Sequence, residues 1–353
     1  MHLSDEEIPD EYLNYVGRKI TFIIGGLVAL GILLILSVSV GAVNIPPVEV
    51  LETLLNLSDR WNVIIWNIRL PQSLTAIVAG VGLAVAGVAM QSILRNPLGS
   101  PFTLGISHAA AFGAAFSVMI LGTGAMHSSG MDAVTIVNPY LTTISAFIFS
   151  MIATAIILGI SRIRAASPEV MVLAGVALGS LFTAGTMFLQ YFADDVQLAA
   201  MVFWTFGDTA RASWSELGLI TIVVILSIVY FIYNRWNYNA IDAGDETAKG
   251  LGVNVERVRL WGMVIASFVT SIVVAFLGVI GFVGLICPHM VRKLIGDDHR
   301  FLIPATCVVG GLLLLAADTA SRLILAPHLL PVAVLTSFLG APVFIYLIIR
   351  GHR

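Results

Sequence analysis

The chain has 353 residues, of which 58% are hydrophobic and only 11% are charged, and its mean hydropathy is +0.96. Soluble domains are nearer half apolar and a quarter charged, so this composition argues against a soluble enzyme and against a disordered chain. The net charge is −3, from 18 Lys and Arg against 21 Asp and Glu, so no basic surface calls for a nucleic-acid partner. Two cysteines, Cys287 and Cys307, are too few for a disulfide scaffold or a four-ligand metal site.

What remains is a polytopic membrane protein, and the length allows about ten helices. A polar, acidic tail at residues 1–19 precedes an uncharged run at 20–43, which is longer than the apolar core of about 7–15 residues in a signal peptide, so we expect a retained first helix. A short segment that contains Pro288 is expected to form a partial or broken helix. Nine apolar segments follow the first, at residues 63–94, 101–121, 139–160, 168–191, 214–233, 258–279, 281–295, 301–325 and 331–349.

The sequence therefore predicts an all-α membrane protein of about ten transmembrane helices, with one transmembrane domain over residues 20–350. Basic residues favour the cytoplasmic side of a membrane. With the N-terminus inside, 14 of the 18 Lys and Arg fall on inside segments, and the other four are Arg60, Arg69, Arg211 and Arg322. The opposite orientation inverts this ratio, so both termini are expected in the cytoplasm.

The longest hydrophilic stretch, at residues 234–259, falls on the cytoplasmic side in this orientation. Within it, residues 242–252 read as a short helix between glycines. Such a loop is either a solvated connector or a docking element for a partner protein, and its composition alone leaves both interpretations open.

Several motifs follow one another along the chain. Arg69-Leu-Pro-Gln72 opens a helix rich in glycine and alanine. The others are RNPLGSPFTLG at 95–105, LAGVALG at 173–179, GDETAKGLG at 244–252, GFVGLICPHMVR at 281–292, DHRFLIP at 298–304, ADTASR at 317–322 and GAPVFIY at 340–346. Together they resemble the iron-complex and cobalamin permease family of ABC importers, the FecCD type of type II import permeases, over roughly residues 20–350.

This resemblance implies a type II importer permease fold and a set of partners. A second copy of the chain would complete the translocation path as a homodimer, two cytoplasmic ATPase subunits would dock beneath it, and an extracytoplasmic binding protein would deliver the substrate. The chain has no phosphate-binding loop of its own. The resemblance thus assigns ATP and Mg²⁺ to the partner ATPase, with no cofactor on this chain and no catalytic role for it. It also implies an iron(III)–siderophore-type cargo, with cobalamin, haem or molybdate as alternatives.

The resemblance places binding-protein docking at Arg69, Gln72 and Arg322, because arginine engages carboxylates through two hydrogen bonds. The family often has a second arginine where this chain has Gln72, which weakens the docking charge or moves it, for example to Arg60 or Arg211. A second interpretation of Arg322 is an intramembrane ion pair with Asp318, which precedes it by one helical turn.

The same resemblance assigns contact with the ATPase to the glycine-bounded helix. The candidate coupling residues are Gly244, Asp245, Glu246, Thr247, Ala248, Lys249 and Gly252. Ser167, Pro168 and Glu169 correspond to the family's cytoplasmic gate. Ser167 also suits a structural helix cap, since Pro168 is well placed as a first helical residue.

Two other classes of protein have less support from the sequence. An ion-coupled secondary transporter usually carries several ionisable residues at the membrane midplane, and this chain offers little beyond Asp318. An intramembrane enzyme needs a nucleophile with a base, or a set of metal ligands, and no pair of histidines has metal-ligand spacing. We therefore expect neither a metal site nor a catalytic site.

Overall fold

The computed structural model describes residues 10–41, 43–126, 134–136, 138–163, 168–325 and 328–350. A two-stranded antiparallel hairpin, β1 (Gly124–Met126) with β2 (Val134–Ile136), pairs Gly124 with Ile136. The helices in chain order are α1 (Asp10–Ser39), α2 (Pro47–Leu54), α3 (Asn62–Ile64), the π-helical turn η1 (Ile65–Arg69), α4 (Leu70–Ile93), α5 (Ile106–Ile120), α6 (Pro139–Ile163), α7 (Pro168–Phe192), α8 (Asp195–Thr205), the 3₁₀ turn η2 (Thr209–Arg211), α9 (Trp214–Tyr233), α10 (Arg235–Asp242), α11 (Asp245–Gly250), α12 (Val255–Leu277), α13 (Val283–Ile295), α14 (His299–Leu323) and α15 (Val332–Arg350).

The predicted helical architecture is confirmed, and each of the ten apolar segments contains a helix. Within the described residues, seven helical stretches are long and apolar enough to cross a membrane, and α5 and α15 are shorter apolar helices. The first residues of the segment 101–121 stay outside α5, because Gly105 adopts a left-handed conformation (φ +75°) just before the helix begins. The short segment around Pro288 is a 13-residue helix, α13, with Pro288 inside it.

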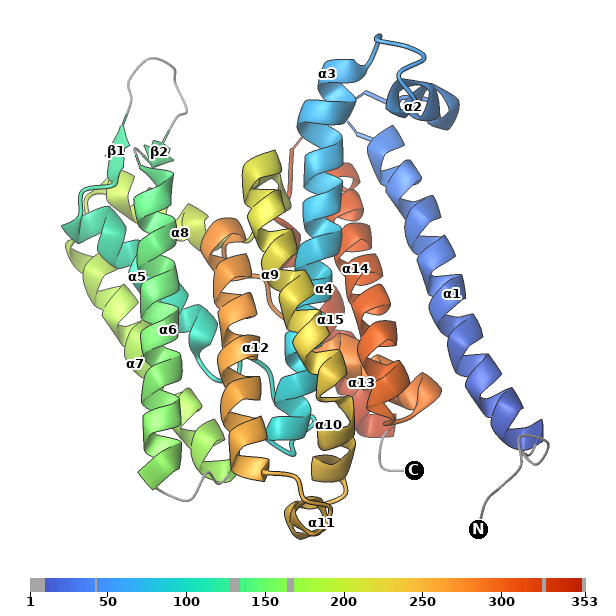
Figure 1. Cartoon of the computed structure of the whole chain (residues 1–353). Coiled ribbons are helices and arrows are strands. Elements are labelled where there is room, and N and C mark those ends of the chain that lie inside the picture. The colour runs from blue at the N-terminus through green and yellow to red at the C-terminus, as the bar shows by residue number, and fades with distance from the viewer. Residues whose placement is uncertain are drawn as a thin grey trace.

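The long helices lie roughly side by side, with α4 near the centre (Figure 1). Helices α5 to α8 form one flank, α1 lies at the opposite edge, and α9, α12 and α14 lie between them. The β1–β2 hairpin and α2 lie at one end of the bundle, called here the hairpin end. Helices α10 and α11 lie at the other, called the α11 end, where α1 also begins.

Helix α4 forms the centre of the core. Of the most apolar 18 consecutive residues in the helical stretch Asn62–Ile93, which contains α4, 78% are buried, against 6% in the corresponding part of α1. The sequence of α4 is rich in glycine and alanine, and small residues let neighbouring helices approach closely where lipid gives no hydrophobic driving force for packing. The exposed apolar surface of α1 is the kind of surface that a lipid bilayer covers.

Glycines bring α4 into backbone contact with two other helices. A Cβ atom on Gly80 would lie 2.2 Å from the carbonyl oxygen of Gly310 on α14. One on Gly87 would lie 1.8 Å from the carbonyl oxygen of Gly284 on α13. No side chain fits at either position without moving a backbone.

Replacing Gly87 with alanine is therefore expected to destabilise the fold by about 1–3 kcal/mol or more through overpacking. Gly25→Ala on α1 is the matched control, because nothing lies within 4 Å of its Cβ position and alanine is the better helix former. Thermal unfolding in detergent measures both variants. Equal stability of the two would contradict the α4–α13 contact.

Candidate functional site

The loop predicted at residues 234–259 contains α10 and α11, and α11 projects beyond the ends of the long helices (Figure 1). Gly244, with φ +119°, separates α10 from α11, and Gly252, with φ +83°, follows α11. These conformations favour glycine, because it lacks the Cβ atom that clashes there. The glycines noted in the sequence thus bound α11 on both sides.

Helix α11 has an inner and an outer face. Ala248 is fully buried and Asp245 points toward α12, whereas Glu246, Thr247 and Lys249 are exposed. Glu246 Oε1 and Lys249 Nζ form an ion pair at 3.0 Å, and the hydrogen bond from Lys249 to Glu246 raises the pKa of Lys249. Because 89% of the Glu246 side chain and 58% of the Lys249 side chain are exposed, the pair contributes little to stability. The outer face is therefore charged and free of any packing role.

The inner face is anchored by one strong ion pair. Both Nη atoms of Arg259 on α12 donate to the Asp245 carboxylate at 2.8 Å, and Arg259 Nε donates to the carbonyl of Ile93 at 3.1 Å. Arg95 lies 3.8 Å from the same carboxylate. Only 5% of the Arg259 side chain is exposed, so this fork fixes the position of α11 against α12 and the end of α4.

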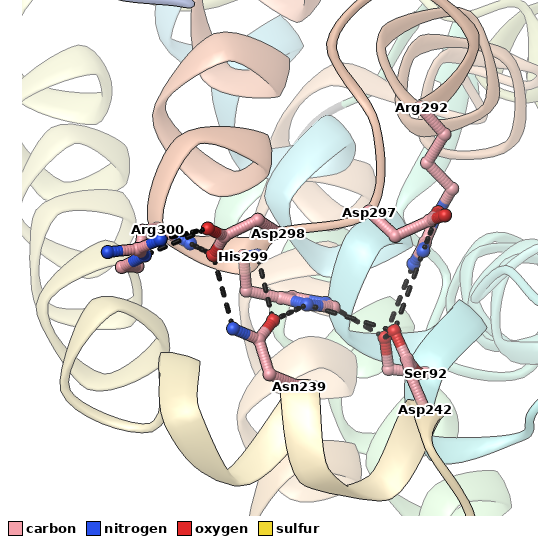
Figure 2. A network of polar contacts seen from close by, with 8 residues as sticks. All are labelled: Ser92, Asn239, Asp242, Arg292, Asp297, Asp298, His299 and Arg300. Atoms are coloured by element: carbon pink, nitrogen blue, oxygen red, sulfur yellow. Dashed lines mark hydrogen bonds and ion pairs between the residues drawn. The ribbon is translucent and has the colours of Figure 1, made fainter. Parts of the chain in front are cut away.

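A second cluster joins α10 to α4, α13 and α14 (Figure 2). Asn239 Oδ1 accepts hydrogen bonds at 2.9 Å from both the backbone N–H and the Nδ1 of His299, at the start of α14. Asn239 Nδ2 donates to Asp298 Oδ1 at 3.1 Å. Since the amide oxygen can only accept, the Nδ1 of His299 carries a proton.

Ser92, buried in the last turn of α4, completes this cluster (Figure 2). Its hydroxyl lies 2.9 Å from Nε2 of His299, 3.3 Å from Asp242 Oδ2 and 3.3 Å from Nη2 of Arg292 on α13. With the proton on Nδ1, the neutral histidine ring can only accept at Nε2, so the single hydroxyl proton of Ser92 is shared between this nitrogen and Asp242 Oδ2. The set of Ser92, Asn239, Asp242, Arg292, Asp298 and His299 is called here the α10 latch.

Two carboxylates of the latch respond differently to their surroundings. Burial raises the pKa of Asp242, and the nearby Arg292 offsets only part of that effect. Burial also disfavours the charged form of Asp298, but hydrogen bonds from Arg300 and Asn239 outweigh it and hold the pKa of Asp298 at about 2. The Asp298 carboxylate therefore stays charged, and accepts from Asn239, throughout the neutral and mildly acidic range.

At the hairpin end, Asp318 on α14 is the centre of a separate buried cluster, called here the Asp318 cluster. It is 1% exposed, and its Oδ2 lies 2.9 Å from Nη2 of Arg322, the ion pair that the i,i+4 spacing predicts. Gln72 Nε2 donates to Asp318 Oδ1 at 3.0 Å, and the Thr209 hydroxyl donates to the same oxygen. The cluster thus ties α4 and η2 to α14.

The two arginines assigned to docking have partners within the chain. Arg322, whose side chain is 9% exposed, also donates to Ser37 Oγ on α1 at 2.6 Å. Arg69, 6% exposed, donates to the carbonyl oxygens of Val38 and Ser39 at 2.7 and 3.1 Å and to that of Val43. Docking through Arg69, Gln72 and Arg322 stays a prediction, and both arginines already stabilise the end of α1.

The predicted gate falls at the start of α7. Pro168 is the first residue of this helix, as its fixed φ favours, and Glu169 lies exposed in the first turn. Ser167, the candidate cap, lies outside the described residues. The gate therefore stays a prediction.

Two largely apolar surface cavities, of about 520 and 690 Å³, share Phe102 and are therefore neighbours. The first lies between the start of α5 and α7, with His108, Gly179 and Met187 in its wall. The second lies between α8 and α15, where Phe206 and Phe338 line it. In the part of the chain that the structure describes, no group of three or more His, Cys, Asp or Glu side chains is placed to hold a metal ion.

None of the six latch residues was among the predicted site residues, and neither were Arg259 of the α11 fork or Ser37 and Thr209 of the Asp318 cluster. Two of them carried a weak sequence signal, since Ser37 and Ser92 are hydroxyl residues within long apolar segments. Their partners lie far away in sequence, so no local pattern pointed to them.

A model of the FecCD transport family matches residues 29–350. The chain belongs to this family. A protein of Methanocaldococcus jannaschii whose name gives it as a candidate ABC transporter permease is 54% identical, over 98% of this chain and 99% of its own length. The hemin transport permease HmuU of Yersinia pestis is 37% identical, over 92% of this chain and 96% of its own length. The Fe(3+)-citrate import permease YfmE of Bacillus subtilis is 34% identical, over 91% and 92%.

A solved structure supports the same assignment. An inward-facing structure whose title gives a candidate metal-chelate type ABC transporter superposes with a TM-score of 0.78 at 27% identity. It covers 94% of this chain and 99% of that chain. This FecCD-family chain is therefore a multi-pass membrane permease of an ABC importer, and the predicted fold class is confirmed.

Proposed function

We propose that this permease imports an iron(III)–siderophore-type metal chelate, driven by ATP hydrolysis on a partner subunit. The observation that carries the ATP-driven mechanism is α11, a short helix with a charged outer face and an inner face fixed by the Asp245–Arg259 fork. When a partner that is bound to the outer face moves α11, the Asp245–Arg259 ion pair transmits that movement to α12. Hemin and Fe(3+)-citrate, named for relatives of 37% and 34% identity, are both iron chelates, and this supports an iron chelate as cargo. Cobalamin stays the alternative, because vitamin B12 permeases are also among the relatives, at 33% identity.

The proposed topology follows from the charges. With 14 of 18 basic residues on one side, the α11 end faces the cytoplasm and the hairpin end faces outward. Two ATPase subunits, holding ATP and Mg²⁺, dock on α11 through Glu246, Thr247 and Lys249, with Gly244 and Gly252 setting the shape of the segment. Pro168 and Glu169 lie at the same end, and in this proposal they form the cytoplasmic gate together with Ser167.

The proposed path lies between two copies of the chain. The neighbouring cavities at α7 and α15 are largely apolar, and α7 exposes Leu181, Met187 and Phe188 beside them. A homodimer that joins these faces gives a wide path with weak contacts, suited to a bulky chelate. Selection of the chelate then rests with the binding protein.

The binding protein docks at the hairpin end in this proposal. Arg322 and Arg69 reach its carboxylates only by giving up bonds to Asp318, Ser37 or the end of α1. Because Gln72 donates to Asp318 and carries no charge, this docking surface has less positive charge than one with an arginine at that position.

Co-purification tests the proposal. The detergent-solubilised chain is isolated from its native membrane, and the associated proteins are identified by mass spectrometry. We expect an ATPase subunit, together with a binding protein that binds a ferric chelate such as ferric citrate more tightly than haemin, cyanocobalamin or molybdate. Recovery of the chain alone, with ion-driven uptake in liposomes, would instead favour a secondary transporter.

A further inference from the structure

Helices α4 and α14 lie against each other along their length (Figure 1) and are joined at three levels. Midway, Gly80 meets Gly310 at backbone contact, and a Cβ on Gly310 would lie 2.4 Å from the Cβ of Ala84. This contact leaves no space for the two helices to slide past one another, because packed interiors do not deform continuously.

At the α11 end, the latch joins the two helices directly and then joins both to α10. The bond between Ser92 on α4 and His299 on α14 is 2.9 Å long, and both side chains are buried. Asn239 holds the same histidine from α10, three residues before Asp242 and six before Asp245 on the coupling segment (Figure 2). A shift of this segment therefore acts on α4 and α14 together.

At the hairpin end, Gln72 on α4 donates to Asp318 on α14 at 3.0 Å. The two ends of this helix pair, Gln72 and Ser92, lie about 30 Å apart at 1.5 Å per helical residue. Polar links thus hold both ends of the pair, and a glycine contact holds the middle.

We propose that α4 and α14 move as one rigid body, held by the latch at the cytoplasmic end and by the Gln72–Asp318 bond at the outer end. This inference rests on the proposed function, and it assigns Asn239, Ser92 and His299 as positioning residues for transport. Binding-protein docking at the outer end and ATPase movement at α11 are linked through this pair, in addition to the Asp245–Arg259 route into α12.

The test is a double-mutant cycle between the two ends, in the complete complex in lipid nanodiscs. Asn239→Ala removes the bonds from α10 to His299 and Asp298, and Gln72→Leu removes the outer link to Asp318. The readout is the stimulation of ATP hydrolysis by saturating binding protein. We expect each single variant to lose about fivefold of the stimulation, and the double variant to lose about the same fivefold. Independent sites this far apart would instead multiply, to about 25-fold.

Asn237→Ala is the matched control, since Asn237 is on the same helix and, within the described residues, its amide donates to Asn234 and to no residue of α4, α13 or α14. Ser92→Ala replaces Asn239→Ala if the latter does not insert. Multiplicative losses, or single variants with unchanged stimulation, would overturn the rigid pair. A wild-type complex that shows no stimulation would refute the proposed function itself, which separates the two failures.

Discussion

Replacing Arg322 with methionine is expected to destabilise the folded chain by about 3–5 kcal/mol. Asp318 is 1% exposed, and Arg322 is its only ion-pair partner among the described residues. Without the guanidinium, the carboxylate keeps its bonds from Gln72 and Thr209 but loses the opposite charge that compensates for its burial. Ser37 loses its arginine bond as well, so α1 is held less firmly against α14. Thermal unfolding of the purified chain in detergent measures the loss.

The matched control is the double variant Asp318→Asn with Arg322→Met. Removing both charges leaves no uncompensated ion, and the asparagine still bonds to Gln72 and Thr209, so most of the stability should return. A double variant as unstable as Arg322→Met would show that the ion pair is not the source of the effect. An unchanged single variant would contradict the buried pair.

In the proposed complex, Glu246→Arg is expected to reduce uptake at least about tenfold, because it replaces the carboxylate on the outer face of α11 with a cation next to Lys249, and mismatched charges at an interface cost several kcal/mol. Folding should be unaffected to within about 0.5 kcal/mol, because the side chain is 89% exposed and its one described ion pair, with Lys249, is at the surface. Uptake into proteoliposomes and co-purification of the ATPase should fall together, with membrane insertion unchanged.

Glu11→Arg supplies the matched control, since this exposed carboxylate lies in the first turn of α1, at one edge of the bundle. Gly252→Pro disrupts the α11 segment by another route, because proline cannot adopt the φ of +83° found there. Normal uptake by Glu246→Arg and Gly252→Pro would refute the assignment of α11 as the coupling helix.

The candidate sites were predictable to different degrees. Asp318 and Arg322 are one helical turn apart, so their pairing followed from sequence spacing alone. The two faces of α11 did not follow, because the inward direction of Asp245 depends on Arg259, which lies on a different helix. The burial of Arg69 could not be predicted from the sequence either, because its hydrogen-bond acceptors are backbone carbonyls, which any residue type supplies.

The sequence by itself determined the membrane class, the helical segments and the family. Long uncharged runs must form helices in lipid, where each backbone N–H and C=O needs a partner within the segment, so this information is local. Only the tertiary structure decided which polar residues meet. Gln72 and Asp318 are 246 residues apart in the chain, and Ser92 and His299 are 207 apart. Their contacts arise from the close packing of α4 on α14, where glycines admit the approach and the buried polar atoms then have to satisfy one another.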